Sequence, residues 1–276
     1  MSLPLVEREI IASGLVPDVT PNPESRMHSR IPLVGEAVSG VIPLGYEHSH
    51  AGQIATAISL GELAVGDRLP AESELADQFG VAIATIRKSL AELRDKGLVE
   101  TRRGRSGGTF VIKVPFPTSN QVSQYLNGIS IVNLRDFGDE RVTVSRGIVH
   151  LACQRAQAAS IQTLECAAER LLNAEEPSAQ ASEYSKFHTQ LTVAAQSPRL
   201  LRLQMRLLSE ITSLLWSPGG AGITPDLVQR DHEEIIEALK QREAFNAQQS
   251  MERHVQDGVY RLIDAKLTLQ SRSETE

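Results

Sequence analysis

Basic side chains gather in one stretch of this acidic chain. Residues 87–113 carry eight of the 28 lysines and arginines and three acidic residues, a local charge of +5, whereas the whole 276-residue chain has a net charge of −6. Lysine and arginine neutralise DNA phosphates, and arginine can also donate two hydrogen bonds to guanine. This asymmetry indicates a phosphate-facing surface.

Residue patterns typical of enzymes are missing from the sequence. We find no helical His-Glu-x-x-His motif, no nucleophile elbow and no Walker loop. Cys153 and Cys166 are the only cysteines, too few for a disulfide framework or a thiolate metal site. We interpret them as half-buried thiols in helices of an intracellular protein. An enzyme is therefore not expected.

Neither a membrane span nor a secretory signal is expected. The longest nearly uncharged stretch, residues 111–135, is rich in Pro, Ser, Asn and Gln and is too polar to cross a bilayer. No basic leader followed by an apolar run opens the chain. We predict a soluble cytoplasmic protein that has no membrane partner.

Three short helices and a hairpin are expected to position the basic stretch. Apolar spacing predicts helices over 53–60, 70–79 and 83–96, with Ile86, Leu90 and Leu93 as the buried stripe of the third. Strands are predicted at 98–101 and 109–112, around a turn rich in Arg and Gly. This order is the outline of a winged helix-turn-helix, which we assign to residues 49–114. Residues 1–48 show little periodicity and are expected to form a partly ordered extension.

The rest of the chain reads as helical. Pro115 and Pro117 predict a linker over 115–120, because X-Pro steps resist helix continuation. The pattern of residues 121–276 then predicts helices over 121–127, 139–158, 160–173, 178–195, 198–216, 224–240 and 242–269. The expected fold is mainly α, with an N-terminal winged helix-turn-helix and a C-terminal all-α helical bundle.

Three motifs with fixed spacing lie in the first domain: Gly66-Asp67-Arg68-Leu69-Pro70-Ala71-Glu72, Thr85-Ile86-Arg87-x-x-Leu90 and Gly107-Gly108-Thr109-Phe110-Val111. With these motifs the domain resembles the DNA-binding domain of GntR-type transcriptional regulators. The resemblance implies that helix 83–96 enters the major groove of a double-stranded DNA operator. It also implies a homodimer, because such operators are two-fold symmetric. The expected DNA contacts are Thr85, Arg87 and Lys88 on the helix and Arg102, Arg103 and Arg105 on the wing turn.

The recognition helix departs from the family pattern at its start. Many relatives have a Ser or Thr N-cap followed by Arg, where this chain has Ala82 and Ile83. Losing the cap costs about 1 kcal/mol of helix stability, and Ile83 cannot bind a phosphate as Arg would. Ser73 also stands where relatives often have Arg, and Lys88 replaces a frequent Glu. The usual family operator is therefore not expected.

The all-α part contains two histidine motifs, Phe187-His188-x-x-Leu191 and Asp231-His232-x-x-Ile235, the second followed further on by His254. These motifs resemble those of the FCD ligand-binding domain of the FadR subfamily. In many such domains three histidines and one aspartate bind a divalent metal that helps to hold a small carboxylate. The resemblance thus implies that His188, His232 and His254 bind Zn or Ni, metals that suit imidazole, with an open position for water or the effector.

Two further positions bear on the effector. Tyr184 stands one helical turn before His188, where the family has Asp. A neutral phenol is a poor ligand because its pKa is near 10, so we expect Tyr184 to donate a hydrogen bond to the effector and metal binding to be weaker than in relatives. Arg141 matches a family arginine that often faces the ligand cavity. The alternative is that the three histidines are core residues hydrogen-bonded to their neighbours.

Three functions are compatible with these residues. The first is a regulator whose operator affinity responds to a small carboxylate in a metal-containing bundle. The second is a regulator-like protein with weakened DNA binding that acts through a protein partner, because Ser73, Ala82 and Ile83 replace expected DNA contacts. The third is a metal-dependent enzyme that uses the three histidines.

Overall fold

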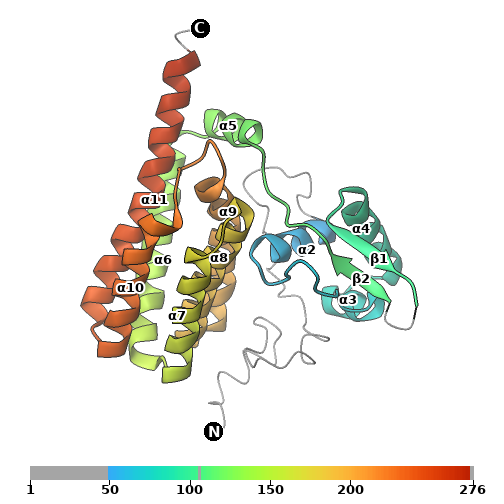
Figure 1. The fold of residues 1–276 in the computed structure, drawn as a ribbon, viewed down its shortest axis with the longest axis horizontal. Helices are drawn as coiled ribbons and strands as arrows, with labels where there is room; N and C mark the ends of the chain where they lie inside the picture. Colours follow the sequence, from blue (N-terminus) through green and yellow to red (C-terminus); the bar gives the residue numbers. More distant parts are fainter. Residues whose placement is uncertain (1–48, 105–106, 274–276) are drawn as a thin grey trace. The chain divides into compact units, whose positions relative to one another are not determined.

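The computed structural model describes residues 49–104 and 107–273 and contains two compact units, divided between Pro115 and Phe116 (Figure 1). Residues 1–48, expected to form an extension, lie outside the described residues. The elements of the first unit are α2 (His50–Ser59), α3 (Glu72–Phe79), α4 (Ile83–Asp95), β1 (Val99–Arg102) and β2 (Gly108–Val111). These elements lie in the order predicted for a winged helix-turn-helix.

Apolar stripes and helix caps build the first unit. Ser49 begins α2 by accepting a hydrogen bond from the Gly52 backbone, and Gly80 ends α3 in the left-handed conformation with φ +67°. Leu75 of α3 and the stripe Ile86, Leu90 and Leu93 of α4 are all buried in one core. The predicted spacing therefore corresponds to the buried face of α4, and the opposite face is exposed.

The wing is a two-stranded antiparallel sheet that a third segment anchors. Val99 pairs with Val111 and Arg102 with Gly108. The loop before α3 runs along the other side of β2, where the Leu69 amide donates to Thr109 and the Val111 amide donates to Asp67. The hairpin is thus hydrogen-bonded on both sides of β2, and this fixes its base to the helical core.

The second unit is a helical bundle, drawn from green to red in Figure 1. Within it α6 packs along α11, α8 packs against both α7 and α9, and α10 packs against α11 and α7. None of the described helices combines the length and the apolar character needed to cross a membrane. The helices are α5 (Ser119–Gly128), α6 (Ile131–Arg155), α7 (Ala158–Leu172), α8 (Pro177–Ala194), α9 (Pro198–Trp216), α10 (Pro225–Gln241) and α11 (Ala244–Ser273). The expected mainly α fold is confirmed.

In two helices of the bundle, a side-chain cap sets a start that lies before the one indicated by the apolar pattern. Helix α5 starts at Ser119, inside the segment assigned to the linker, because Thr118 forms a capping box with Gln121. Helix α6 starts at Ile131, eight residues before the expected 139, because the Ser130 side chain accepts a hydrogen bond from the Asn133 backbone. In both cases a polar cap determines the helix start.

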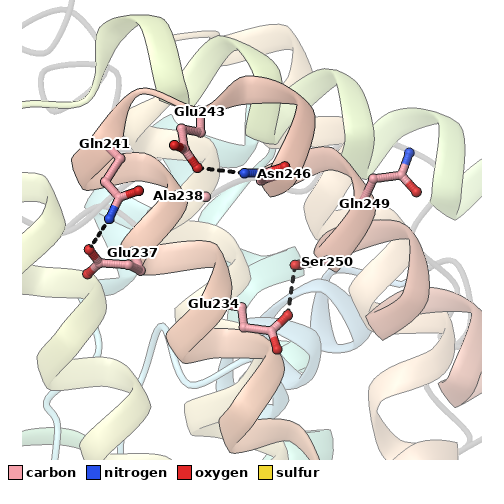
Figure 2. Close-up of a pocket in the computed structure, with 8 residues that line it drawn as sticks. All are labelled: Glu234, Glu237, Ala238, Gln241, Glu243, Asn246, Gln249 and Ser250. Atoms are coloured by element: carbon pink, nitrogen blue, oxygen red, sulfur yellow. Dashed lines mark hydrogen bonds between the residues drawn. The ribbon is translucent and has the colours of Figure 1, made fainter.

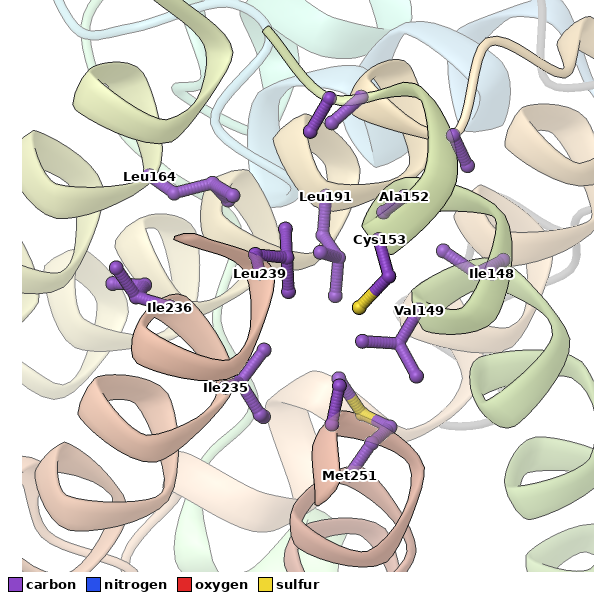
Figure 3. Packing of buried hydrophobic residues seen from close by; sticks show 14 of the residues in the cluster. Ile148, Val149, Ala152, Cys153, Leu164, Leu191, Ile235, Ile236, Leu239 and Met251 are labelled. Atoms are coloured by element: carbon purple, nitrogen blue, oxygen red, sulfur yellow. The ribbon is translucent and has the colours of Figure 1, made fainter. Parts of the chain in front are cut away.

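The bundle core joins α6, α7, α8, α10 and α11. Figure 3 shows Val149, Leu191, Leu239 and Met251 converging around the Cys153 thiol. Cys153 is buried, and burial raises the pKa of its thiol, whereas Cys166 is exposed. The expectation of two half-buried thiols was therefore wrong for both, because the α7 residue faces away from the core.

Candidate DNA-binding surface and candidate metal centre

Helix α4 carries the predicted recognition residues on its outer face. Arg87 and Lys88 are exposed and Thr85 is partly buried, because the stripe that begins at Ile86 occupies the opposite face. The Nε atom of Arg87 donates to Glu72 Oε2 of α3 at 2.7 Å, and the Arg87 side chain stays 69% exposed. This exposure leaves the terminal guanidinium nitrogens accessible to a base or a phosphate.

The start of α4 differs from a capped, cationic helix start. Ala82 occupies the N-cap position with extended backbone geometry, and no side chain caps the helix. Ile83 follows with 42% of its surface exposed. An apolar side chain therefore stands at the end of the helix that points toward a bound base in this motif.

The wing provides two described arginines, and their environments differ. Arg102 lies over the Phe110 ring at 4.4 Å and pairs with Glu100 at 2.7 Å, so its guanidinium already has a stacking partner and an anion. Arg103 is exposed. Arg105 lies outside the described residues. Sequence reasoning missed Arg68, whose side chain packs against Gly108 so closely that a Cβ there would lie 2.5 Å from Arg68 Nε.

The three predicted metal ligands meet inside the bundle. His188 comes from α8, His232 from α10 and His254 from α11, and one ring nitrogen of each lies within 4.8 Å of the others. All three side chains are buried. The Nε2 atoms of His188 and His254 are 3.1 Å apart. Zn–N bonds are about 2.0–2.1 Å long, so two nitrogens that share one ion are at most about 4.2 Å apart, and binding would draw the more distant rings slightly closer.

Burial favours the neutral form of these imidazoles. Burial, together with the neighbouring histidines, lowers the pKa of His188 and of His232 well below the usual value. Burial also lowers the pKa of His254, although Asp231 partly opposes the shift. Neutral imidazole is the form that binds metals.

His232 is held by stacking. Its ring lies parallel to Phe187, with centroids 3.7 Å apart and an interplanar angle of 8°. Among the described residues neither of its ring nitrogens has a hydrogen-bond partner. A fully buried imidazole with two unsatisfied nitrogens costs free energy. The alternative of core histidines satisfied by their neighbours therefore does not describe His232.

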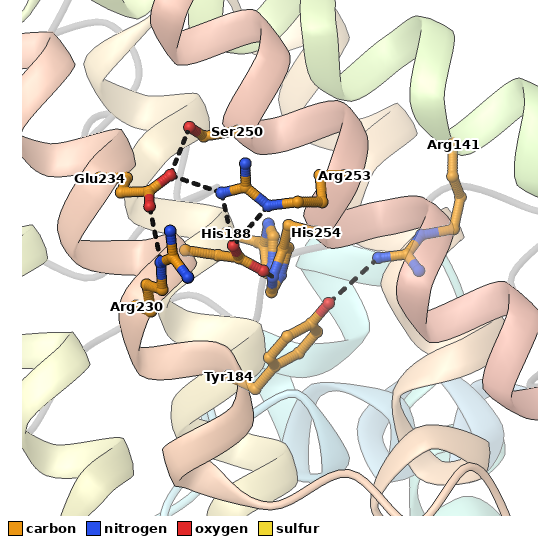
Figure 4. A network of polar contacts seen from close by, with 9 residues as sticks. Arg141, Tyr184, His188, Arg230, Glu234, Ser250, Arg253 and His254 are labelled. Atoms are coloured by element: carbon orange, nitrogen blue, oxygen red, sulfur yellow. Dashed lines mark hydrogen bonds and ion pairs between the residues drawn. The ribbon is translucent and has the colours of Figure 1, made fainter.

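Tyr184 and Arg141 lie beside the histidines. The Tyr184 ring centroid is 4.5 Å from that of His188 and 5.7 Å from that of Trp216. Arg141 is 1% exposed and donates to Tyr184 Oη through Nη2 at 3.5 Å (Figure 4). The Arg141 Nε and Nη1 atoms and the Trp216 Nε1 atom have no partner among the described residues. Three buried donors, on the two side chains that flank Tyr184, thus lack acceptors among the described residues.

An ionic network that sequence reasoning did not predict borders the histidines. Asp231 receives two hydrogen bonds from Arg253 and faces His254 Nδ1 at 3.5 Å. Burial alone would raise the pKa of Asp231, but hydrogen bonds from His254 and Arg253 lower it overall. Asp231 is part of the Asp231-His232 pair in the sequence, which was the only available signal for its position.

A shallow depression on the bundle surface lies between α10 and α11 (Figure 2). Its lining includes the carboxylates of Glu234, Glu237 and Glu243 and contains no Lys, Arg or His. Glu234 is paired with Arg230 and Arg253, and Glu237 with Lys240, so the depression presents no unpaired cation to an anion. The buried donors around Arg141 are therefore the better candidates for binding a carboxylate.

The chain is similar to known proteins over both units. Residues 50–111 match the bacterial regulatory proteins of the gntR family, and residues 139–257 match the FCD domain. RmpR of Mycobacterium gastri, named as an HTH-type transcriptional regulator, is 42% identical over 219 residues, which cover 79% of this chain and 80% of RmpR. The Uxu operon regulator of Haemophilus influenzae is 25% identical over 217 residues, covering 75% and 78% of the two chains. A solved GntR-family member from Pseudomonas syringae aligns with a TM-score of 0.45 and 18% identity, over 90% of this chain and 96% of that chain.

Proposed function

The chain belongs to the GntR family of bacterial regulatory proteins and carries an FCD domain, and from this membership we propose that it controls transcription by binding a specific operator. We further propose that a small carboxylate effector, held in the FCD bundle, changes its affinity for that operator. The relatives described above are named as regulators, which favours regulation over catalysis.

The exposed face of α4 is the observation that carries the DNA-binding proposal. Arg87 and Lys88 project from a helix whose other face is buried, and Arg103 adds a cation on the wing. We propose Arg87 as a base or phosphate contact, Lys88 as a phosphate contact and Thr85 at the edge of the interface. Arg102 and Arg105 complete the proposed set. A homodimer would place two such units on a symmetric operator.

The buried nitrogens support the effector and metal proposals. His188, His232 and His254 provide three buried imidazoles with ring nitrogens within 4.8 Å of one another, and both nitrogens of His232 lack a partner among the described residues. This donor set fits a divalent Zn or Ni ion, since both favour imidazole ligands. A bound ion would supply a Lewis-acidic position for a carboxylate oxygen.

Arg141 and Tyr184 are proposed to recognise the effector. Arg141 is a buried cation whose Nε and Nη1 atoms lack acceptors, and a carboxylate would both satisfy and neutralise it. Tyr184 Oη accepts a hydrogen bond from Arg141, so its own proton remains available for donation. The pair therefore favours an anionic ligand over a neutral or cationic one.

Binding of the protein to the DNA upstream of its own gene tests the proposal. A mobility-shift titration with that duplex should give a specific complex whose affinity falls steeply as salt increases. A panel of small carboxylic acids should contain at least one compound that changes this affinity and also raises the melting temperature of the protein. Specific binding that no carboxylate alters would leave the DNA proposal standing and remove the effector proposal.

The start of α4 supports a second candidate, a regulator with weakened DNA binding that acts through a protein partner. This candidate rests on Ala82, an N-cap residue that cannot cap the helix with its side chain, and on the exposed Ile83. Substituting Ile83→Arg separates the two. If DNA is the partner, the variant should bind the duplex more tightly, because one more phosphate contact is available. A wild-type protein with no preference for its upstream DNA, and an Ile83→Arg variant without added affinity, would favour the second candidate.

A further inference from the structure

Asp231 contacts two residues of the neighbouring helix through different oxygens. Its Oδ1 atom accepts hydrogen bonds from Arg253 Nε at 3.0 Å and Nη2 at 2.7 Å. Its Oδ2 atom faces His254 Nδ1 at 3.5 Å. Because Arg253 holds one oxygen from two nitrogens, the carboxylate cannot rotate freely and its second oxygen stays directed at the histidine.

Arg253 is itself fixed by a second carboxylate. Its Nη2 atom also donates to Glu234, which accepts further hydrogen bonds from Ser250 at 3.0 Å and Arg230 at 2.9 Å (Figure 4). Glu234 contacts the same arginine as Asp231, but its hydrogen bonds and ion pairs in the described structure go to Arg230, Ser250 and Arg253, and to none of the three histidines. The two carboxylates therefore share Arg253 as an ionic partner, but only Asp231 also faces a histidine of the cluster.

An ionised carboxylate only accepts hydrogen bonds, so His254 must present a proton at Nδ1. In neutral imidazole the other nitrogen then carries a lone pair. That nitrogen, Nε2, is the atom that lies 3.1 Å from His188 Nε2. Among the three clustered histidines of the described structure, only His254 has a carboxylate facing the ring nitrogen that points away from the cluster, Nδ1. His232 is oriented by stacking on Phe187.

From this geometry we propose that Asp231 is a positioning residue, which holds His254 in the Nδ1-protonated tautomer with its Nε2 lone pair facing His188 and His232. The consequence for metal binding rests on the proposed function, since Nε2 would be the ligand atom. Carboxylate–histidine pairs of this kind orient ligands, and their loss typically weakens metal binding about 10–100-fold.

The substitution Asp231→Asn tests this role because it should reverse the tautomer. The two Arg253 donors require an acceptor, so the asparagine oxygen should turn toward Arg253 and its NH₂ group toward His254. His254 Nδ1 must then accept, and its proton moves to Nε2, the atom that faces the cluster. Glu234→Gln is the matched control, since it removes the negative charge of the other carboxylate that binds Arg253 and leaves Asp231 in place.

The tautomer is read from long-range ¹H–¹⁵N spectra of the metal-free full chain with ¹⁵N-labelled histidine. The His254 signals are identified by their absence in a His254→Gln variant. We expect protonation at Nδ1 in the wild type and in Glu234→Gln, and protonation at Nε2 in Asp231→Asn. The same tautomer in all three proteins would overturn the proposal.

Competition with a chromophoric chelator then measures Zn²⁺ affinity. We expect Asp231→Asn to bind Zn²⁺ about 10–100-fold more weakly than the wild type and Glu234→Gln to bind it as the wild type does. Equal affinities for Asp231→Asn and the wild type would also overturn the proposal. A wild type that binds no Zn²⁺ would instead contradict the metal in the proposed function, and the two failures are distinguishable because the spectra are recorded without metal.

Discussion

Arg87 of α4 and Glu72 of α3 form an ion pair that joins the two helices of the helix-turn-helix, with the Nε atom 2.7 Å from the carboxylate. The contact uses the Nε atom of the guanidinium and leaves both terminal nitrogens outside the pair. A guanine is read by two parallel donors. Glu72 therefore holds Arg87 in a pose that keeps its terminal nitrogens free, and it also places a negative charge near the DNA surface.

Replacing Glu72 with Gln should loosen sequence discrimination. Gln can still accept a hydrogen bond from Arg87 but removes the negative charge that repels phosphates. Because exposed charge interactions are worth about 0–1 kcal/mol, we expect up to about 5-fold tighter binding to unrelated DNA and a smaller gain on the operator. Fluorescence anisotropy on the two duplexes gives the ratio. Weaker binding to unrelated DNA would contradict the assigned repulsion.

The substitution Tyr184→Asp should tighten metal binding. An aspartate at this position, one turn before His188, would add a charged oxygen ligand where the wild type has a phenol. The chelator competition assay provides the measurement, and Tyr184→Phe is the control, since it removes the hydroxyl without adding a ligand. If Tyr184→Asp and Tyr184→Phe show the same Zn²⁺ affinity, the cluster is not completed from this position.

Arg141→Met should separate stability from effector response. Arg141 is 1% exposed and lacks partners at two of its three nitrogens, so its burial is costly in the absence of an anion. Replacing buried ion pairs with apolar side chains of similar volume is often neutral or stabilising, by about 1–4 kcal/mol, and an unpaired buried charge has less attraction to lose. We expect an unchanged or higher melting temperature together with loss of the carboxylate-induced shift. A variant that keeps the full shift would remove Arg141 from the effector site.

The sequence predicted the elements that apolar periodicity determines. The stripe of Ile86, Leu90 and Leu93 located α4, and the prolines at 177, 198 and 225 coincide with the starts of α8, α9 and α10. The start of α6 was missed because a single polar cap, Ser130, decides it. Family motifs indicated three histidines, and the structure brings them together.

The surroundings of those histidines were beyond sequence reasoning. The contact between Asp231 and His254 joins two helices across a sharp turn, at which Arg242 adopts φ +59° and donates to the Cys153 and Ala156 carbonyls. Its geometry depends on how α10 and α11 pack, which no local pattern encodes. The stacking of His232 on Phe187 and the unpaired donors of Arg141 also arise from packing between helices.

Whether α4 reads an operator can be measured by fluorescence anisotropy, as the operator affinity of Arg87→Ala compared with that of Arg94→Ala. Both substitutions remove one positive charge from α4, and Arg94 lies in its last turn, away from the proposed base contacts. We predict that Arg87→Ala loses about 1–3 kcal/mol of binding free energy on the operator and that Arg94→Ala changes it much less. Equal affinities for the wild type and Arg87→Ala would contradict the assignment of α4 as the recognition helix.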